Sequence, residues 1–205
     1  MRKNKSSKSW IIQQHRDKYF KEAKSSGYRS RSAYKLLELN EKFKFLNNCH
    51  SVIDLGSSPG GWSQAIKRNT KNCKILAIDI KEMEKINGID FLRCDFLEDN
   101  SKEKILKFFN DKADVLVSDM AANTTGNKDL DCIRTNLLCS EVINFSRFVV
   151  KKEGTVIAKL FNGYDFLDVK KLAEKKFEKV NFFKPNSSKD FSKETYIHCK
   201  GFKTL

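Results

Sequence analysis

Residues 51–64 constrain the fold of this chain more than any other stretch. The apolar residues 52–55 predict a short buried strand, and residues 56–61 predict a tight turn that opens a helix near Trp62. The turn contains Gly56, Pro59, Gly60 and Gly61. Glycine lets a backbone come close to a ligand, and a helix start presents unpaired N–H groups. The turn therefore predicts a nucleotide-type site, with a plain strand-to-helix connection as the alternative.

The glycine spacing separates two classes of nucleotide ligand. Gly-x-x-x-Gly-Gly differs from the Gly-x-Gly-x-x-Gly of dinucleotide-binding turns. Asp54 comes directly before the turn, where enzymes that use S-adenosylmethionine (SAM) place an acidic residue near the methionine end. The spacing thus favours SAM and disfavours a nicotinamide-dependent dehydrogenase.

From Ser51 onward, predicted strands and helices alternate. Strands are predicted at 52–55, 74–79, 90–93, 114–118, 155–159, 177–183 and 195–200. Helices are predicted at 30–44, 61–69, 102–110, 130–151 and 166–175. Short apolar strands of this kind are typical of a parallel sheet that is covered on both faces. The fold class is therefore α/β: a Rossmann-like, seven-stranded, mostly parallel sheet with helices on both faces.

The chain is predicted to form a single domain over residues 1–205. Residues 28–205 form its catalytic core and residues 1–27 a basic N-terminal extension. The first eight residues or so are expected to be disordered, and Ser9 is expected to cap a helix that runs to about Lys24.

The charge and the cysteine content limit which partners and which structural sites are expected. The net charge is +14, and residues 1–35 hold eleven Lys/Arg against two acids, which favours a polyanion as partner over a merely solubilising tail. The six cysteines form no C-x-x-C pair, and there are three histidines, so neither a zinc site nor a disulfide framework is expected. No apolar run is long enough to span a membrane, and the lysine-rich start lacks the apolar segment of a secretory signal.

Acidic residues close several of the predicted strands. In a sheet of this kind, ligands bind outside the carboxyl ends of the strands. Asp79 could accept both ribose hydroxyls of a nucleoside, and Asp95 could meet its adenine, with Phe96 against the ring. Asp119 ends the next strand. Each is weak evidence alone, because aspartate at a strand end often only caps a helix; together with the glycine turn, they predict a nucleoside site.

The chain resembles the FtsJ/RrmJ family of ribosomal RNA ribose 2′-O-methyltransferases from about Trp10 to Gly201. The resemblance rests on residues 29–36 (Arg-Ser-Arg-Ser-Ala-Tyr-Lys-Leu), the glycine turn, residues 117–121 (Val-Ser-Asp-Met-Ala), and the stretch from 184–185 (Lys-Pro) to 194–196 (Glu-Thr-Tyr). It implies a catalytic Lys-Asp-Lys-Glu tetrad at Lys35, Asp119, Lys159 and Glu194. It also implies SAM contacts at Gly60, Trp62, Asp79, Asp95 and Asp119. Two departures are Ala122, where proline is expected, and Lys189, where arginine is expected.

A ribose 2′-hydroxyl must lose its proton as it attacks the SAM methyl group. Lys159 could accept that proton if neutral, which repulsion from Lys35 and the sulfonium would favour. Asp119 and Glu194 stabilise the charged lysine instead, so their role would be orientation. The balance of these effects is open at this point.

The resemblance implies a uridine of large-subunit ribosomal RNA as target, in the ribosomal subunit. It implies RNA contacts at Arg29, Arg31, Lys184 and Lys189. The enzyme is predicted to be a monomer without a metal, acting in ribosome biogenesis in the cytoplasm, with organelle import as the alternative location. A catalytically silent RNA-binding or ribosome-assembly factor on the same fold is the alternative function.

Overall fold

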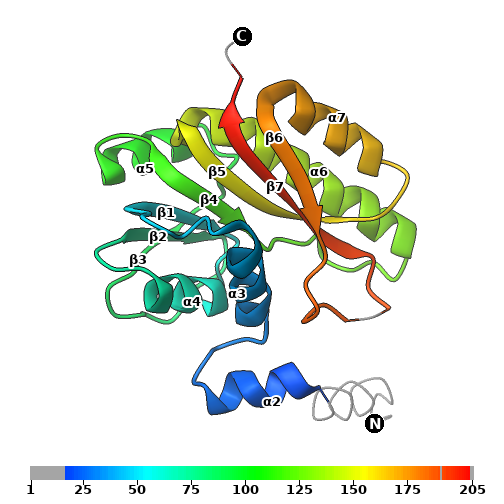
Figure 1. Cartoon of the computed structure of the whole chain (residues 1–205), viewed down its shortest axis with the longest axis horizontal. Helices are drawn as coiled ribbons and strands as arrows, with labels where there is room; N and C mark the ends of the chain where they lie inside the picture. Colours follow the sequence, from blue (N-terminus) through cyan, green and yellow to red (C-terminus); the bar gives the residue numbers. More distant parts are fainter. Residues whose placement is uncertain (1–16, 190, 204–205) are drawn as a thin grey trace.

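The computed structural model describes residues 17–189 and 191–203. Its centre is a seven-stranded sheet in the order β3-β2-β1-β4-β5-β7-β6 (Figure 1). The strands are β1 (Ser51–Leu55), β2 (Lys74–Asp79), β3 (Asp90–Arg93), β4 (Ala113–Ser118), β5 (Val150–Phe161), β6 (Phe177–Phe183) and β7 (Glu194–Phe202). The α/β fold with a mostly parallel sheet is confirmed.

Strands β1 to β5 pair in parallel, whereas β7 runs antiparallel to both β5 and β6. The chain leaves β1 toward β2 and β3 on one side and then returns to β4 on the other. The strand order thus reverses between β1 and β4, which is the place where open α/β sheets bind ligands.

Helices cover both faces of the sheet. They are α3 (Ser32–Phe43), α4 (Gly61–Asn69), α5 (Ser101–Phe109), α6 (Lys128–Val149) and α7 (Phe166–Lys176). Helix α2 (Lys18–Ser25) lies away from the sheet, next to α3 (Figure 1). Alternate strand residues enter two separate cores: Ile53 and Leu55 pack with α5, α6 and α7, and Val52 packs with α3 and α4. This division follows from the two-residue repeat of a strand, and it requires apolar residues on both faces.

Most predicted elements lie within one or two residues of the observed ones, but one boundary is wrong. The helix predicted to run to residue 151 ends at Val149, and β5 begins at Val150, five residues before the predicted strand. Val150 is buried and pairs with Ala113, and the register shifts before the next pair. β-branched side chains favour strands over helices, which explains the early change at this valine.

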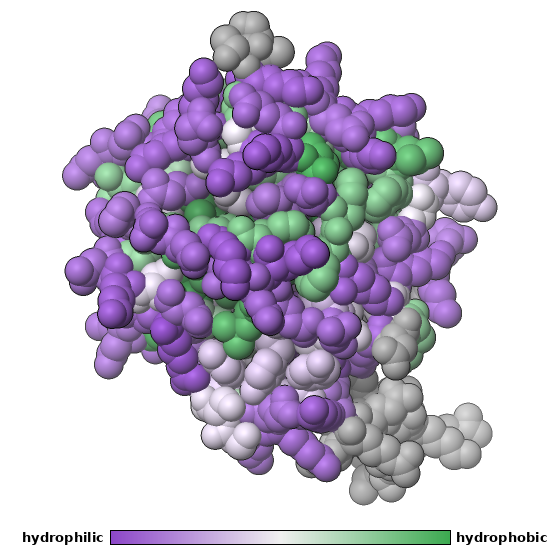
Figure 2. Space-filling view, viewed as in Figure 1, coloured by the Kyte–Doolittle hydropathy of each residue, from purple (hydrophilic) through white to green (hydrophobic). Residues whose placement is uncertain are grey.

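Helix α2 begins after Asp17, whose side chain accepts a hydrogen bond from the N–H of Phe20. The predicted disorder of the first residues and the predicted cap at Ser9 lie outside the described residues. All six cysteines are unpaired and buried, as expected for thiols that serve packing. The face shown in Figure 2 is mostly hydrophilic, and no helix in the described ranges is long and apolar enough to cross a bilayer.

Candidate active site

Four charged side chains from distant parts of the sequence meet above the carboxyl end of β4. Lys159 Nζ lies 3.0 Å from Asp119 Oδ1 and 3.9 Å from Glu194 Oε2. Lys35 Nζ lies 2.7 Å and 2.8 Å from the two carboxylate oxygens of Glu194. The four residues singled out by resemblance therefore form one ion-pair cluster with alternating charge. We refer to Lys35, Asp119, Lys159 and Glu194 as the tetrad.

The strand register explains how three of these groups converge. Lys159 of β5 is opposite Tyr196 of β7, and Phe161 is opposite Glu194. Paired residues share a face of the sheet, and so do residues two apart on one strand. Lys159, Tyr196 and Glu194 therefore share the face that α3 covers, and Lys35 reaches them from that helix.

The cluster fixes the charge of two of its members. Burial alone would lower the pKa of Lys35, but the Asp119 and Glu194 carboxylates outweigh burial and hold that pKa above its ordinary value. Burial alone would raise the pKa of Asp119, but the charges of Lys159 and Lys35 hold it below its ordinary value. Lys35 is therefore an ammonium and Asp119 a carboxylate at neutral pH.

Tyr196 and Ser188 belong to the same cluster and were not predicted from the sequence. The fully buried Tyr196 donates its hydroxyl proton to Asp119 Oδ1 at 2.6 Å, and Ser188 donates to Glu194 Oε1 at 2.8 Å. Burial and the negative charge of Asp119 raise the pKa of Tyr196 well above its ordinary value. Tyr196 is thus a neutral donor that orients Asp119. Tyr196 lies in a predicted strand two residues after Glu194, so both side chains are expected on the same face of the sheet, and this spacing could have identified it.

Helix α3 also holds the loop that precedes β7. Glu38, one turn after Lys35, accepts hydrogen bonds from the N–H groups of Asn186 at 2.6 Å and Ser187 at 2.9 Å. Arg31 donates to the carbonyl of Ser187. These bonds fix the loop that carries Ser188, and through it they fix Glu194. Glu38 was also missed by the sequence analysis.

Beside the tetrad lies a cavity of about 630 Å³ at the carboxyl ends of β1, β2 and β4. Its lining includes Gly56, Asp79, Asp95, Phe96, Asp119 and Met120. The size falls in the range of about 300–1,000 Å³ that is typical of small-molecule sites. Five residues predicted to bind a cofactor, Gly56, Asp79, Asp95, Phe96 and Asp119, therefore line one cavity that reaches the tetrad.

The other predicted cofactor residues support this cavity without lining it. Among the described residues, its lining excludes Asp54, Pro59, Gly60, Gly61 and Trp62. Asp54 is buried and accepts a hydrogen bond from Ser63 at 2.6 Å, and burial raises its pKa to about 7. Trp62 donates to the carbonyl of Ser32 and packs beside Tyr196. Both side chains have interior contacts in the structure, and their contact with a cofactor stays a prediction.

Two glycines of the turn permit close packing. A Cβ atom on Gly56, whose φ is +73°, would collide with the Met120 side chain, and one on Gly61 would collide with Ser30. The turn is therefore in direct contact with the loop after β4 on one side and with the start of α3 on the other. Asp79 also contacts the turn, because its carboxylate accepts a hydrogen bond from the Ser58 N–H at 2.8 Å.

The four predicted RNA-binding side chains have contacts within the protein. Arg29 donates to the carbonyls of Pro59, Glu84 and Lys85, and Arg31 pairs with Asp17. Lys184 donates to the carbonyl of Ser192, and Lys189 lies over the Phe191 ring. Both arginines thus have structural roles, and the RNA contacts of all four residues stay predictions.

Comparison with known sequences gives a consistent result. The model of the FtsJ-like methyltransferase family matches residues 28–202. "Ribosomal RNA large subunit methyltransferase E" of Pelagibacter ubique is 49% identical over 200 residues, which cover 98% of this chain and 98% of that protein. The protein of the same name from Rickettsia akari is 43% identical, over 94% of this chain and 87% of that protein.

Comparison with solved structures agrees with the comparison of sequences. A Plasmodium falciparum protein described as a ribosomal RNA methyltransferase has a TM-score of 0.76 and 33% identity, over 85% of this chain and 98% of that one. Human methyltransferase-like protein 13, solved with S-adenosylhomocysteine, has a TM-score of 0.55 and 13% identity, over 82% of this chain and 78% of that one. The second likeness concerns the fold alone.

Proposed function

Because this chain belongs to the FtsJ-like methyltransferase family, we propose that it transfers a methyl group from SAM to the ribose 2′-OH of a uridine in large-subunit ribosomal RNA. The observation that carries the proposal is the convergence of Lys35, Asp119, Lys159 and Glu194 at the end of a nucleoside-sized cavity. Asp119 belongs to both the cavity and the tetrad, so the two reactants would meet there.

The cavity fits SAM. Asp79 offers carboxylate acceptors for a ribose diol at the end of β2, and Asp95 and Phe96 offer an acceptor and a ring for an adenine. SAM supplies an electrophilic methyl group when it is bound. The face of Asp119 toward Lys159 and Tyr196 is occupied by their hydrogen bonds, so Asp119 positions Lys159.

In the proposed mechanism, Lys159 accepts the proton of the 2′-hydroxyl. Asp119 accepts two of its hydrogen bonds, one through the carboxylate and one through the main-chain carbonyl at 2.7 Å, and so fixes the direction of Nζ. Lys35 is held as an ammonium on Glu194. Proton transfer and alignment of the hydroxyl with the methyl group together supply the catalysis.

The alternative of a silent RNA-binding or assembly factor has no observation in its favour, because every tetrad member is present and paired. A direct test supplies labelled SAM with large ribosomal subunits that lack the modification, and uses small subunits as the control. Transfer to the large subunit alone is expected. No transfer to either subunit or to naked RNA, by a folded protein that binds SAM, would favour the silent factor.

The basic N-terminal region is proposed to bind RNA phosphates. Lys18, Lys21 and Lys24 of α2 are exposed and carry the described part of this charge. For each phosphate that the protein neutralises, the slope of the logarithm of the binding constant against the logarithm of the salt concentration changes by roughly −0.7 to −0.9. Replacing all three by alanine should therefore flatten the salt dependence of subunit binding by about two units and leave SAM affinity unchanged.

The check is subunit affinity across a salt series for the wild type and the triple variant. A triple variant of Lys170, Lys171 and Lys175 on α7 removes equal charge from another helix and serves as control. Equal slopes for the wild type and the α2 variant would mean that α2 does not contact RNA.

A further inference from the structure

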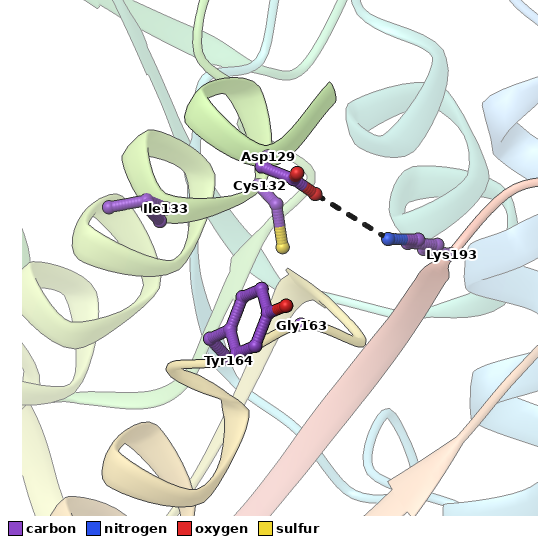
Figure 3. Close-up of a pocket in the computed structure, with 6 residues that line it drawn as sticks. All are labelled: Asp129, Cys132, Ile133, Gly163, Tyr164 and Lys193. Atoms are coloured by element: carbon purple, nitrogen blue, oxygen red, sulfur yellow. Dashed lines mark ion pairs between the residues drawn. The ribbon is translucent and has the colours of Figure 1, made fainter. Parts of the chain in front are cut away.

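A second cavity, of about 290 Å³, lies between the first turns of α6 and the loop that joins β5 to α7 (Figure 3). Its lining consists of Asp129, Cys132, Ile133, Gly163, Tyr164 and Lys193. We call it the α6 pocket. Figure 3 shows the Tyr164 ring on one side and the Asp129–Lys193 ion pair, 3.9 Å long, on the other.

The floor of the α6 pocket is fixed by a buried polar network. Asn136, fully buried on α6, donates to the Phe161 carbonyl and to Asp165 Oδ1, both at 2.9 Å, and accepts the Phe161 N–H at 2.7 Å. A Cβ atom on Gly163 would collide with Cys132 Sγ, so the loop lies directly against α6. The pocket is therefore held in shape before any ligand binds.

The α6 pocket begins where the β5–β7 ladder ends, next to the tetrad. Phe161 is opposite Glu194 in that ladder, and the Asn162 N–H donates to the Lys193 carbonyl at 2.9 Å. Lys193 is adjacent to Glu194, and Gly163 follows Lys159 by four residues. At about 3.3 Å per strand residue, the Cα atom of Gly163 lies within about 13 Å of the Cα atom of Lys159, at the same end of the sheet. A nucleotide next to the methylated one can span such a distance.

The chemistry of the lining suits an unstacked nucleobase. Tyr164 is 91% exposed, and no ring contact or hydrogen bond holds its side chain in the part of the chain that the structure describes. Ile133 adds exposed apolar surface, and Lys193 adds a cation. Proteins that bind single-stranded RNA stack its bases on aromatic side chains, while lysine contacts phosphate.

We propose that the α6 pocket binds an unpaired nucleobase that flanks the target uridine, with the base stacked on Tyr164 and Lys193 near its phosphate. The inference rests on the proposed function, since it concerns the same RNA. Its volume is at the low end for small-molecule sites, which suits a single base. Stacking on tyrosine tolerates any base, so the pocket would position the strand without reading its sequence.

The test measures KM for large ribosomal subunits and kcat with Tyr164→Ala, Tyr164→Trp and Tyr164→Leu. Loss of a base–aromatic stack weakens binding by roughly 5- to 150-fold. Tyr164→Ala and Tyr164→Leu should therefore raise KM by about tenfold, with SAM affinity and thermal stability unchanged. Tyr164→Trp, which keeps a stacking surface, should stay within about twofold of the wild type.

Phe148→Ala is the matched control. Phe148 is also an exposed aromatic, although less exposed than Tyr164, and it lies at the far end of α6, where Lys102 covers its ring. Its removal should leave KM unchanged. If the wild type methylates the subunit and Tyr164→Ala has the same KM, the pocket inference is overturned and the proposed function stands. If the wild type transfers no methyl group, the proposed function fails, and the inference fails with it.

Discussion

Replacing Lys159 by alanine is expected to reduce turnover by about 10²- to 10⁴-fold, the usual effect of losing a general base. SAM affinity and subunit affinity should change little, because the role of Lys159 is confined to proton transfer in the transition state. The measurement is single-turnover methyl transfer at saturating subunit and SAM, with both affinities determined separately. Lys152→Ala removes an exposed lysine from the same strand and should behave as the wild type.

Lys159→Arg separates proton transfer from simple charge. Arginine keeps the positive charge beside Asp119 but cannot be deprotonated in a protein. If Lys159 is the base, the arginine variant should be as slow as the alanine variant. Recovery of near wild-type turnover by Lys159→Arg would show that the tetrad needs a cation there, and the proposed role of Lys159 would be wrong.

The second large effect is expected from Asp79→Ala, which should weaken SAM binding by roughly 5- to 150-fold. The estimate corresponds to about 1–3 kcal/mol for leaving buried hydroxyls unpaired. Calorimetry on the folded variant measures it directly. Asp90→Ala removes an exposed aspartate from the opposite end of a neighbouring strand, and it should leave the affinity unchanged.

Asp79 also accepts hydrogen bonds from the backbone N–H groups of Ser58 and Lys81, both at 2.8 Å. The loss of a direct contact with SAM must therefore be distinguished from an indirect effect through the turn. The separation uses S-adenosylhomocysteine and its 3′-deoxy analogue. The wild type should bind the deoxy analogue more weakly, whereas Asp79→Ala should bind both ligands equally. A variant that still discriminates between them would place the ribose diol elsewhere.

Local signals predicted most of the fold. Apolar runs and turn residues located all seven strands. The central strands β1 and β4 are covered on both faces and form apolar segments, whereas the edge strands β3 and β6 are partly exposed. The early start of β5 was missed because two valines close a long helical pattern, and Val150 becomes a strand residue only by pairing with Ala113. That pairing is a tertiary contact, which a local pattern does not contain.

Some residues of the candidate site could be predicted from the sequence and others could not. The acids at the strand ends followed from the parallel sheet, and the tetrad followed from resemblance. The contact of Glu38 with the loop before β7 joins residues 148 positions apart, and no local pattern signals it. For Arg29 the resemblance implied an RNA contact, which stays a prediction, but no local pattern indicated that its guanidinium holds the turn and the 84–85 loop. The sequence shows that a residue is charged, but it does not show which groups that side chain contacts.

The central claim is that the methyl group goes to a ribose oxygen. The most direct test methylates unmodified large ribosomal subunits with labelled SAM, digests the RNA and identifies the labelled nucleoside by mass spectrometry. We expect one 2′-O-methyluridine, with its 3′ phosphodiester bond resistant to alkali because the 2′-hydroxyl is blocked. A label on a base, or on a nucleoside whose 3′ bond is still cleaved by alkali, would contradict the account.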